Sequence, residues 1–159
     1  MSNGIIVDDK VVMKALMSLS IRQMNKAYKN GMKEALKPLL NQTRTNLRKS
    51  GIQGVSRPYV SKKTGKTYKS MMQGIKSTIH NVGNTQDDMY GNVHIMGEFR
   101  LKWFEMGTKL RKPNRGKKQG GAIKPYRFFE KAKKSTAEMI VSSLDNRLKT
   151  AILKAWESK

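Results

Sequence analysis

Two acidic residues, Asp8 and Asp9, precede a run of apolar positions at helical spacing. Acidic side chains are favourable at a helix N-terminus, so the pattern predicts a helix that begins near residue 9. After a break near residues 18–20 the spacing continues, which predicts helical structure over 9–50 in total. Pro38 lies inside this segment, where its missing N–H leaves one carbonyl without a partner, and we expect a kink or a loosened turn there.

The apolar period changes to two within residues 73–108, which predicts an antiparallel hairpin followed by an aromatic turn. Small and polar residues between the two strands supply the turn of the hairpin. A register that pairs Ile79 with Ile95 also pairs Ile75 with Phe99, and it places the apolar side chains on one face. We therefore expect this register.

A last helical pattern begins at Pro125, a residue type favoured at the first helical position, and it predicts a helix over 125–157. The order of elements predicts one α+β domain, with N-terminal helices, a small antiparallel sheet built on a hairpin, and a long C-terminal helix. Four aromatic residues match the apolar pattern and are not interleaved with cations. We expect them in the core rather than in a base-stacking surface: Trp103, Phe104, Phe128 and Phe129.

The 159-residue chain carries 33 Lys and Arg against 11 Asp and Glu, a formal net charge of +22. Residues 35–86 hold ten basic side chains and residues 106–129 hold eight, and neither window contains an acid. Gly, Ser, Thr and Pro interrupt both windows, so we expect long basic loops over 51–70 and 109–124. Such loops are uncommon unless they bind something or stay disordered, the alternative being a solvated, solubilising segment. The candidate contact residues are Arg57, Lys62, Lys63, Lys66, Lys69, Lys109, Arg111, Lys112, Arg115, Lys117, Lys118 and Lys124.

Composition excludes several kinds of chemistry. The chain has no Cys, which removes disulfides and thiolate nucleophiles and fits a reducing cytoplasm. No segment approaches the roughly 18 consecutive apolar residues of a membrane span, and the acids near the start interrupt an export signal, so we expect no membrane partner. Residues 64–67 match only the end of a phosphate-binding P-loop, since Val60 stands where that motif requires Gly.

Candidate catalytic and metal-binding residues are few. His80 and His94 face each other in the expected register, but the nearest acids, Asp87 and Asp88, lie on the order of 20 Å along extended strands. Glu105 has no acid, His or metal ligand beside it in the sequence, and we expect it to pair with a basic residue or to cap a backbone end. We therefore expect no catalytic residue, no metal and no cofactor.

Two segments together resemble a known family. An aromatic pair, Glu, an apolar residue, Gly and Thr are followed by a basic Gly-containing loop and then by a Pro-aromatic helix start with a small residue after it. This order is similar to the tail-completion or head–tail joining family of long-tailed bacteriophages. The residues that carry the resemblance are Trp103, Phe104, Glu105, Gly107, Thr108, Pro125, Phe128, Phe129 and Ala132.

The resemblance implies a non-enzymatic virion protein, made in the host cytoplasm, that forms a ring, commonly sixfold, in the neck between capsid and tail. Its neighbours would be connector or head-closure proteins and tail-terminator or tail-tube proteins, and the ring would surround the DNA channel, so genome DNA is a further candidate partner. The charge also fits a sequence-independent nucleic-acid-binding protein of ribosomal or nucleoid type, although the sequence lacks helix-turn-helix spacing, a zinc finger and an RNA-binding strand signature. A small metal-dependent hydrolase is a third, weaker hypothesis.

Overall fold

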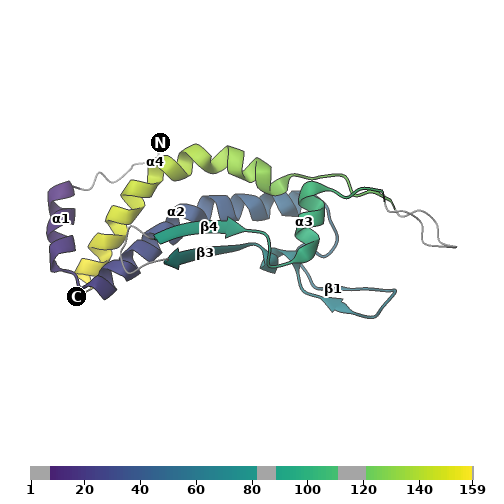
Figure 1. Cartoon of the computed structure of the whole chain (residues 1–159), viewed down its shortest axis with the longest axis horizontal. Helices are drawn as coiled ribbons and strands as arrows, with labels where there is room; N and C mark the ends of the chain where they lie inside the picture. Colours follow the sequence, from purple (N-terminus) through teal and green to yellow (C-terminus); the bar gives the residue numbers. More distant parts are fainter. Residues whose placement is uncertain (1–7, 82–88, 111–120, 159) are drawn as a thin grey trace. The chain divides into compact units, whose positions relative to one another are not determined.

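The structure, a computed structural model, describes residues 8–81, 89–110 and 121–158 (Figure 1). Four α-helices and two two-stranded sheets lie within these residues, and they confirm the α+β prediction. The elements in chain order are α1 Asp9–Ser18, α2 Ile21–Lys49, β1 Tyr59–Val60, β2 Thr67–Tyr68, the 3-10 turn η1 Met71–Gly74, β3 Lys76–Asn81, β4 Met89–His94, α3 Phe99–Met106 and α4 Phe128–Glu157.

The contacts within the chain define two compact units. Unit 1 comprises residues 1–38, 77–93 and 136–159, and unit 2 comprises residues 39–76 and 94–135. Both α2 and α4 contribute residues to each unit. The organisation as a single domain stays a prediction.

The two N-terminal helices begin where the sequence predicts. Asp8 caps α1, because its side chain accepts a hydrogen bond from the backbone N–H of Lys10 at 2.9 Å. Ser20 and Gln23 form a capping box at the start of α2: the Ser20 N–H donates to Gln23 Oε1 at 3.0 Å and the Gln23 N–H to Ser20 Oγ at 3.4 Å. The break near residues 18–20 is therefore the junction between two separately capped helices.

Unit 1 has a core of small and medium apolar side chains from three helices. Its buried members are Val12, Ala15, Leu19, Ala27 and Ile152. The helices α2 and α4 approach closely at Gly31, where an added Cβ would lie 3.0 Å from the Cα of Leu148. A larger residue at this position would force the two backbones apart.

The sheet of β3 and β4 is antiparallel, as predicted (Figure 1), but the expected register is wrong. The ring of His80 stacks on Tyr90, with centroids 5.0 Å apart, instead of facing His94. Phe99 cannot pair with Ile75 because it begins the helix α3, whose N-terminus is capped by the preceding acid, Glu98. The end of the strand pattern thus contains a helix, which the sequence interpretation took for a turn.

Unit 2 is built around the contact between η1 and α3. The N–H of Gly97 donates to the carbonyl of Gly74 at 3.2 Å, and an added Cβ on Gly74 would lie 2.4 Å from the Cβ of Glu98. Met71 of η1 and Leu101 of α3 are fully buried here. The unit buries further large side chains, namely Leu47, Ile75 and Phe128.

The C-terminal helix starts later than predicted, at Phe128 rather than Pro125. Residues 126 and 127 are instead bonded to the end of α3, since the Tyr126 N–H donates to the Phe104 carbonyl at 2.8 Å and the Arg127 N–H to the Glu105 carbonyl at 3.3 Å. Along α4 the side chains of Phe128 and Ile152 are buried, whereas those of Met139 and Leu144 are exposed.

Candidate interaction surfaces

Glu105 caps α4 from a distant position in the sequence. Its Oε2 accepts the backbone N–H of Phe129 at 2.9 Å, and its Oε1 accepts the N–H of Glu130 at 2.8 Å. These are the second and third residues of α4, whose amides have no partner inside the helix. The carboxylate therefore does the work of an N-cap and places negative charge at the positive end of the helix. Of the roles predicted for Glu105, the structure shows the capping of a backbone end.

The next residues of the motif close the base of the second basic segment. The N–H of Thr108 donates to the Ile123 carbonyl at 2.9 Å, and the Ile123 N–H donates to Thr108 Oγ1 at 3.0 Å. Gly107 has a φ of 76°, and an added Cβ there would lie 2.8 Å from the Ile123 carbonyl oxygen and 3.0 Å from Pro125 Cδ. Only Gly fits this position without strain. Pro125 thus packs against the turn after α3 and does not open a helix.

The aromatic residues of the motif have different environments. Phe128 is buried, as predicted, and Ala132 beside it is fully buried. Phe104 is partly buried and meets the Tyr126 ring edge-on, with centroids 6.1 Å apart. Trp103 was expected in the core, but 39% of its surface is exposed. On α3, Trp103 lies on the side opposite Leu101, which is buried in the core. Periodicity alone did not reveal which of these two residues is exposed.

The first basic segment is also closed at its base. The N–H groups of Met71 and Met72 donate to the carbonyls of Gly54 and Val55 at 3.0 and 3.1 Å, and the buried Ser70 hydroxyl donates to the Val55 carbonyl at 2.7 Å. Between these bonds the chain forms the hairpin of β1 and β2, in which Tyr59 pairs with Tyr68 and Val60 with Thr67. The segment predicted as a loop over 51–70 therefore contains a short hairpin.

The candidate cations of the first segment all lie on the surface of this hairpin or beside it. Arg57, Lys62, Lys63, Lys66 and Lys69 are exposed. Residues 64–67 lead from the turn into β2, with Gly65 at a φ of 64°, and the next helical turn, η1, begins only at Met71. This geometry agrees with the rejection of a P-loop, which requires a helix directly after its Lys.

Only the ends of the second basic segment are described. Lys109 and Lys124 are exposed. The other predicted contact residues of this segment lie outside the described residues: Arg111, Lys112, Arg115, Lys117 and Lys118.

Four aromatic rings form a row across β1, β2 and α3. Tyr59 stacks on Tyr68 with centroids 6.4 Å apart, Tyr68 meets Phe99 at 6.4 Å, and Phe99 meets Trp103 at 5.1 Å. We call Tyr59, Tyr68, Phe99 and Trp103 the aromatic row. The sequence interpretation missed it, because Tyr59 and Tyr68 stand in a segment predicted to be loop and come next to the α3 rings only after folding.

Cations lie against the aromatic row. The guanidinium carbon of Arg100 is 4.9 Å from the centroid of the Tyr68 ring, and Lys66 Nζ is 6.0 Å from it. Arg100 also donates to Glu98 Oε1 at 2.8 Å and to the Lys69 carbonyl at 2.7 Å. The hydrogen bond from Arg100 lowers the pKa of Glu98, so this carboxylate is ionised and engaged at neutral pH.

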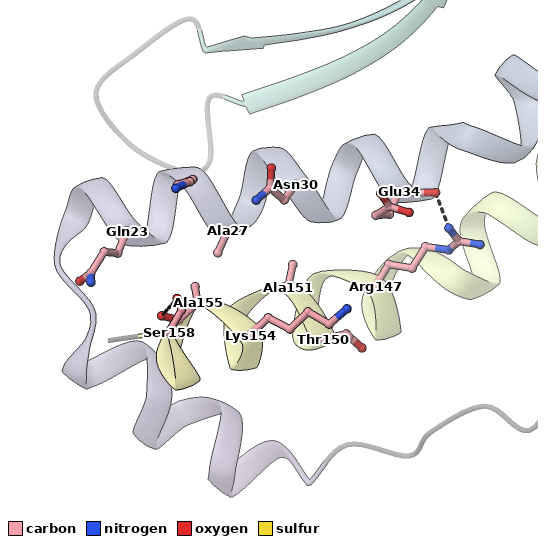
Figure 2. A pocket seen from close by; sticks show the side chains of 11 residues that line it. Gln23, Ala27, Asn30, Glu34, Arg147, Thr150, Ala151, Lys154, Ala155 and Ser158 are labelled. Atoms are coloured by element: carbon pink, nitrogen blue, oxygen red, sulfur yellow. Dashed lines mark hydrogen bonds between the residues drawn. The ribbon is translucent and has the colours of Figure 1, made fainter.

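A groove of about 720 Å³ runs between α2 and α4 in unit 1 (Figure 2). The methyl groups of Ala27, Ala151 and Ala155 line it together with polar and basic side chains. At one end Arg147 donates a hydrogen bond to the backbone carbonyl of Glu34, which Figure 2 draws as a dashed line. Glu34 is four residues before Pro38, so this is the carbonyl that the proline leaves without a helical donor. Arg147 thus supplies the missing bond, a role that no local sequence signal indicates.

The sequence argues against a metal site because the two histidines lie far from the nearest acids. The structure also places His80 differently from the expected register. His80 is stacked on Tyr90, and Asp87 and Asp88 lie outside the described residues. Within the described ranges, no group of three His, Cys, Asp or Glu side chains is close enough to hold a metal ion. In the same part of the chain, none of the helices has both the length and the apolar character needed to cross a membrane.

Comparison of the chain with protein-family models, with curated proteins and with solved structures gives no match.

Proposed function

We propose that this chain is a structural subunit of a bacteriophage neck, a tail-completion or head–tail joining protein that forms a ring around the DNA channel. The observation that carries the proposal is a pair of hydrogen bonds that connects the two halves of the motif. Glu105 of the first half accepts hydrogen bonds from the N–H groups of Phe129 and Glu130 in the second. Residues that resemble the family at separate places in the sequence therefore act together, as parts of one framework.

This framework supports a structural rather than a catalytic role. Both carboxylate oxygens of Glu105 accept hydrogen bonds from backbone N–H groups, which holds this side chain in place as the cap of α4. Gly107 and Thr108 bond or pack against Ile123 and Pro125, and they close the base of the basic segment 109–122. A hydrogen-bonded base that carries a basic segment suits a subunit that contacts neighbours through that segment.

Exposed apolar side chains also support assembly. In unit 1 the most exposed are Met17, Val141 and Ile21, and in unit 2 they are Met96, Met106 and Leu110. Large apolar side chains at such exposure are stabilised when a partner covers them. The proposal assigns them to contacts between subunits or with the adjoining rings.

Light scattering on the purified protein, together with averaged images of the particle neck, tests the ring. We expect a closed oligomer, and we expect trypsin to cut residues 57–69 and 109–124 in the free subunit but not in the assembled particle. Their bases are fixed by hydrogen bonds, so cleavage should leave the two fragments of each cut associated until denaturant is added. A monomer at all concentrations, present as single unconnected copies in the particle, would contradict the proposal.

The second candidate function is sequence-independent nucleic-acid binding of the ribosomal or nucleoid type. The exposed cations of the first basic segment favour it. If the protein has this function, its affinities for two unrelated DNA duplexes should agree within a few-fold. Both affinities should fall steeply as salt is raised, because phosphate neutralisation releases counterions. Binding of this kind by a protein that never self-associates would favour this function over the neck subunit.

A further inference from the structure

The charge of the chain is divided unequally between the two compact units. Unit 2 contains 22 Lys and Arg against three acids, a formal net charge of +19. Unit 1 contains 11 Lys and Arg against eight acids, a net charge of +3. Sequence windows could not show this division, because each unit is assembled from separate stretches of the chain.

The three acids of unit 2 are all engaged. Glu98 bonds Arg100, and Glu105 caps α4. Glu130 lies 3.1 Å from Lys134 Nζ and 3.8 Å from Arg127 Nε. Each of the three carboxylates therefore already has a partner within unit 2. The exposed cations of the unit outnumber the anions that could neutralise them.

The aromatic row belongs to this basic unit, and three of its four residues are exposed while Tyr68 is partly buried. Tyr59 is 38% exposed, Phe99 54% and Trp103 39%. Lys62, Lys63, Lys66 and Lys69 are exposed on the same hairpin or beside it, and Lys102 is exposed on α3, the helix that carries Phe99 and Trp103. Aromatic side chains interleaved with cations are the composition by which proteins bind single-stranded nucleic acid: the rings stack on bases while the cations neutralise phosphates.

We infer that the aromatic row is a binding site for single-stranded nucleic acid, without preference for sequence. At the aromatic row itself, charge favours this occupant over a second copy of the chain, because the two units of another copy carry formal net charges of +3 and +19. A duplex would satisfy the cations but would leave the rings without bases to stack on. The site is independent of ring formation and goes beyond the proposed structural role.

Fluorescence anisotropy tests the site with two labelled probes, a 20-nucleotide oligo(dT) and a mixed-sequence duplex of 20 base pairs, at the same ionic strength. We expect the double variant Tyr59→Ala/Phe99→Ala to weaken oligo(dT) binding by about fivefold or more, since each stacked base contributes on the order of 1 kcal/mol or more. Its duplex affinity should change by less than about twofold. Tyr90→Ala is the matched control, because Tyr90 is 49% exposed but lies in unit 1, and it should leave both affinities unchanged.

A second measurement does not depend on the double variant folding correctly. In a Trp156→Phe background Trp103 is the single tryptophan, and oligo(dT) should quench its fluorescence at saturation while the duplex should not. The inference would be overturned if the double variant lost affinity for both probes equally, or if oligo(dT) did not quench the fluorescence of Trp103. So would unchanged oligo(dT) binding together with a smaller oligomer in light scattering, which would make the row a contact between copies.

Discussion

Replacing Glu105 by Ala should destabilise the fold measurably without touching the hydrophobic core. The substitution removes two hydrogen bonds, of 2.9 and 2.8 Å, from the second and third amides of α4. Loss of an N-cap side chain costs about 0.5–2 kcal/mol, and an acid at the N-terminal turn adds about 0.3–1 kcal/mol through the helix dipole. Glu105 is only partly buried, so water can solvate the freed amides in part. We expect a loss of about 2 kcal/mol.

Glu105→Gln removes the charge and one of the two acceptor oxygens. The amide keeps one acceptor oxygen and so can retain one of the two bonds, and we expect it to lose about 1 kcal/mol. Urea unfolding at neutral pH gives both values from the shift in midpoint at constant slope. Glu138→Ala provides the control, since Glu138 is an exposed acid on the same helix and its removal should change stability by less than about 0.5 kcal/mol.

Hydrogen exchange shows whether any loss arises at the cap itself. In Glu105→Ala the amides of Phe129 and Glu130 should exchange faster than in the wild type, while the amides of α1 keep their rates. The assignment of Glu105 as the cap of α4 fails if the Ala variant is no less stable than Glu138→Ala, or if exchange of those two amides is unchanged.

Three further perturbations test other parts of the structure. Arg147→Met should lower the free energy of unfolding by about 1 kcal/mol in the wild type. In a Pro38→Ala background the loss should be less than half of that, because the restored N–H at position 38 donates to the Glu34 carbonyl. Equal losses in a double-mutant cycle measured by urea unfolding would contradict this. Hydrogen bonds to Asp145 and Asp9 raise the pKa of Lys149 to about 12, so its stabilising effect should be complete below pH 10.5 and lost as the pH rises towards 12. Thermal unfolding of wild type and Lys149→Met across this range should therefore converge at high pH. Gly107→Ala should lower stability by about 2 kcal/mol, from its positive φ and the contact with Ile123, and a neutral result would mean that the turn readily rearranges.

Sequence reasoning succeeds where the signal for an element lies beside it. The start of α1 follows from Asp8, whose side chain caps the helix two residues away, and the break before α2 coincides with the capping box of Ser20. The start of α4 does not follow, because its cap comes from a residue more than twenty positions earlier. Pro125 offers a local start signal, but the pairing of the next two residues with the end of α3 overrides it.

The same limit explains which parts of the candidate surfaces were found. The cations are visible in the sequence, since charge is a property of each residue. The aromatic row is not, because Tyr68 and Phe99 become neighbours only when the β1–β2 hairpin and α3 come together. Trp103 was expected in the core because it matches the apolar pattern, but the segment predicted as a turn forms α3, on which Leu101 is buried and Trp103 is exposed.

The closed bases of the two basic segments also bear on how the chain can be altered by evolution or by engineering. Thr108 and Ile123 hold the ends of a 14-residue stretch together by two hydrogen bonds. Doubling the length of such a stretch adds only about 0.6 kcal/mol of closure entropy. Insertions there, whether natural variation or an affinity tag placed after Arg115, should therefore be tolerated by the fold and would change only what the segment can reach.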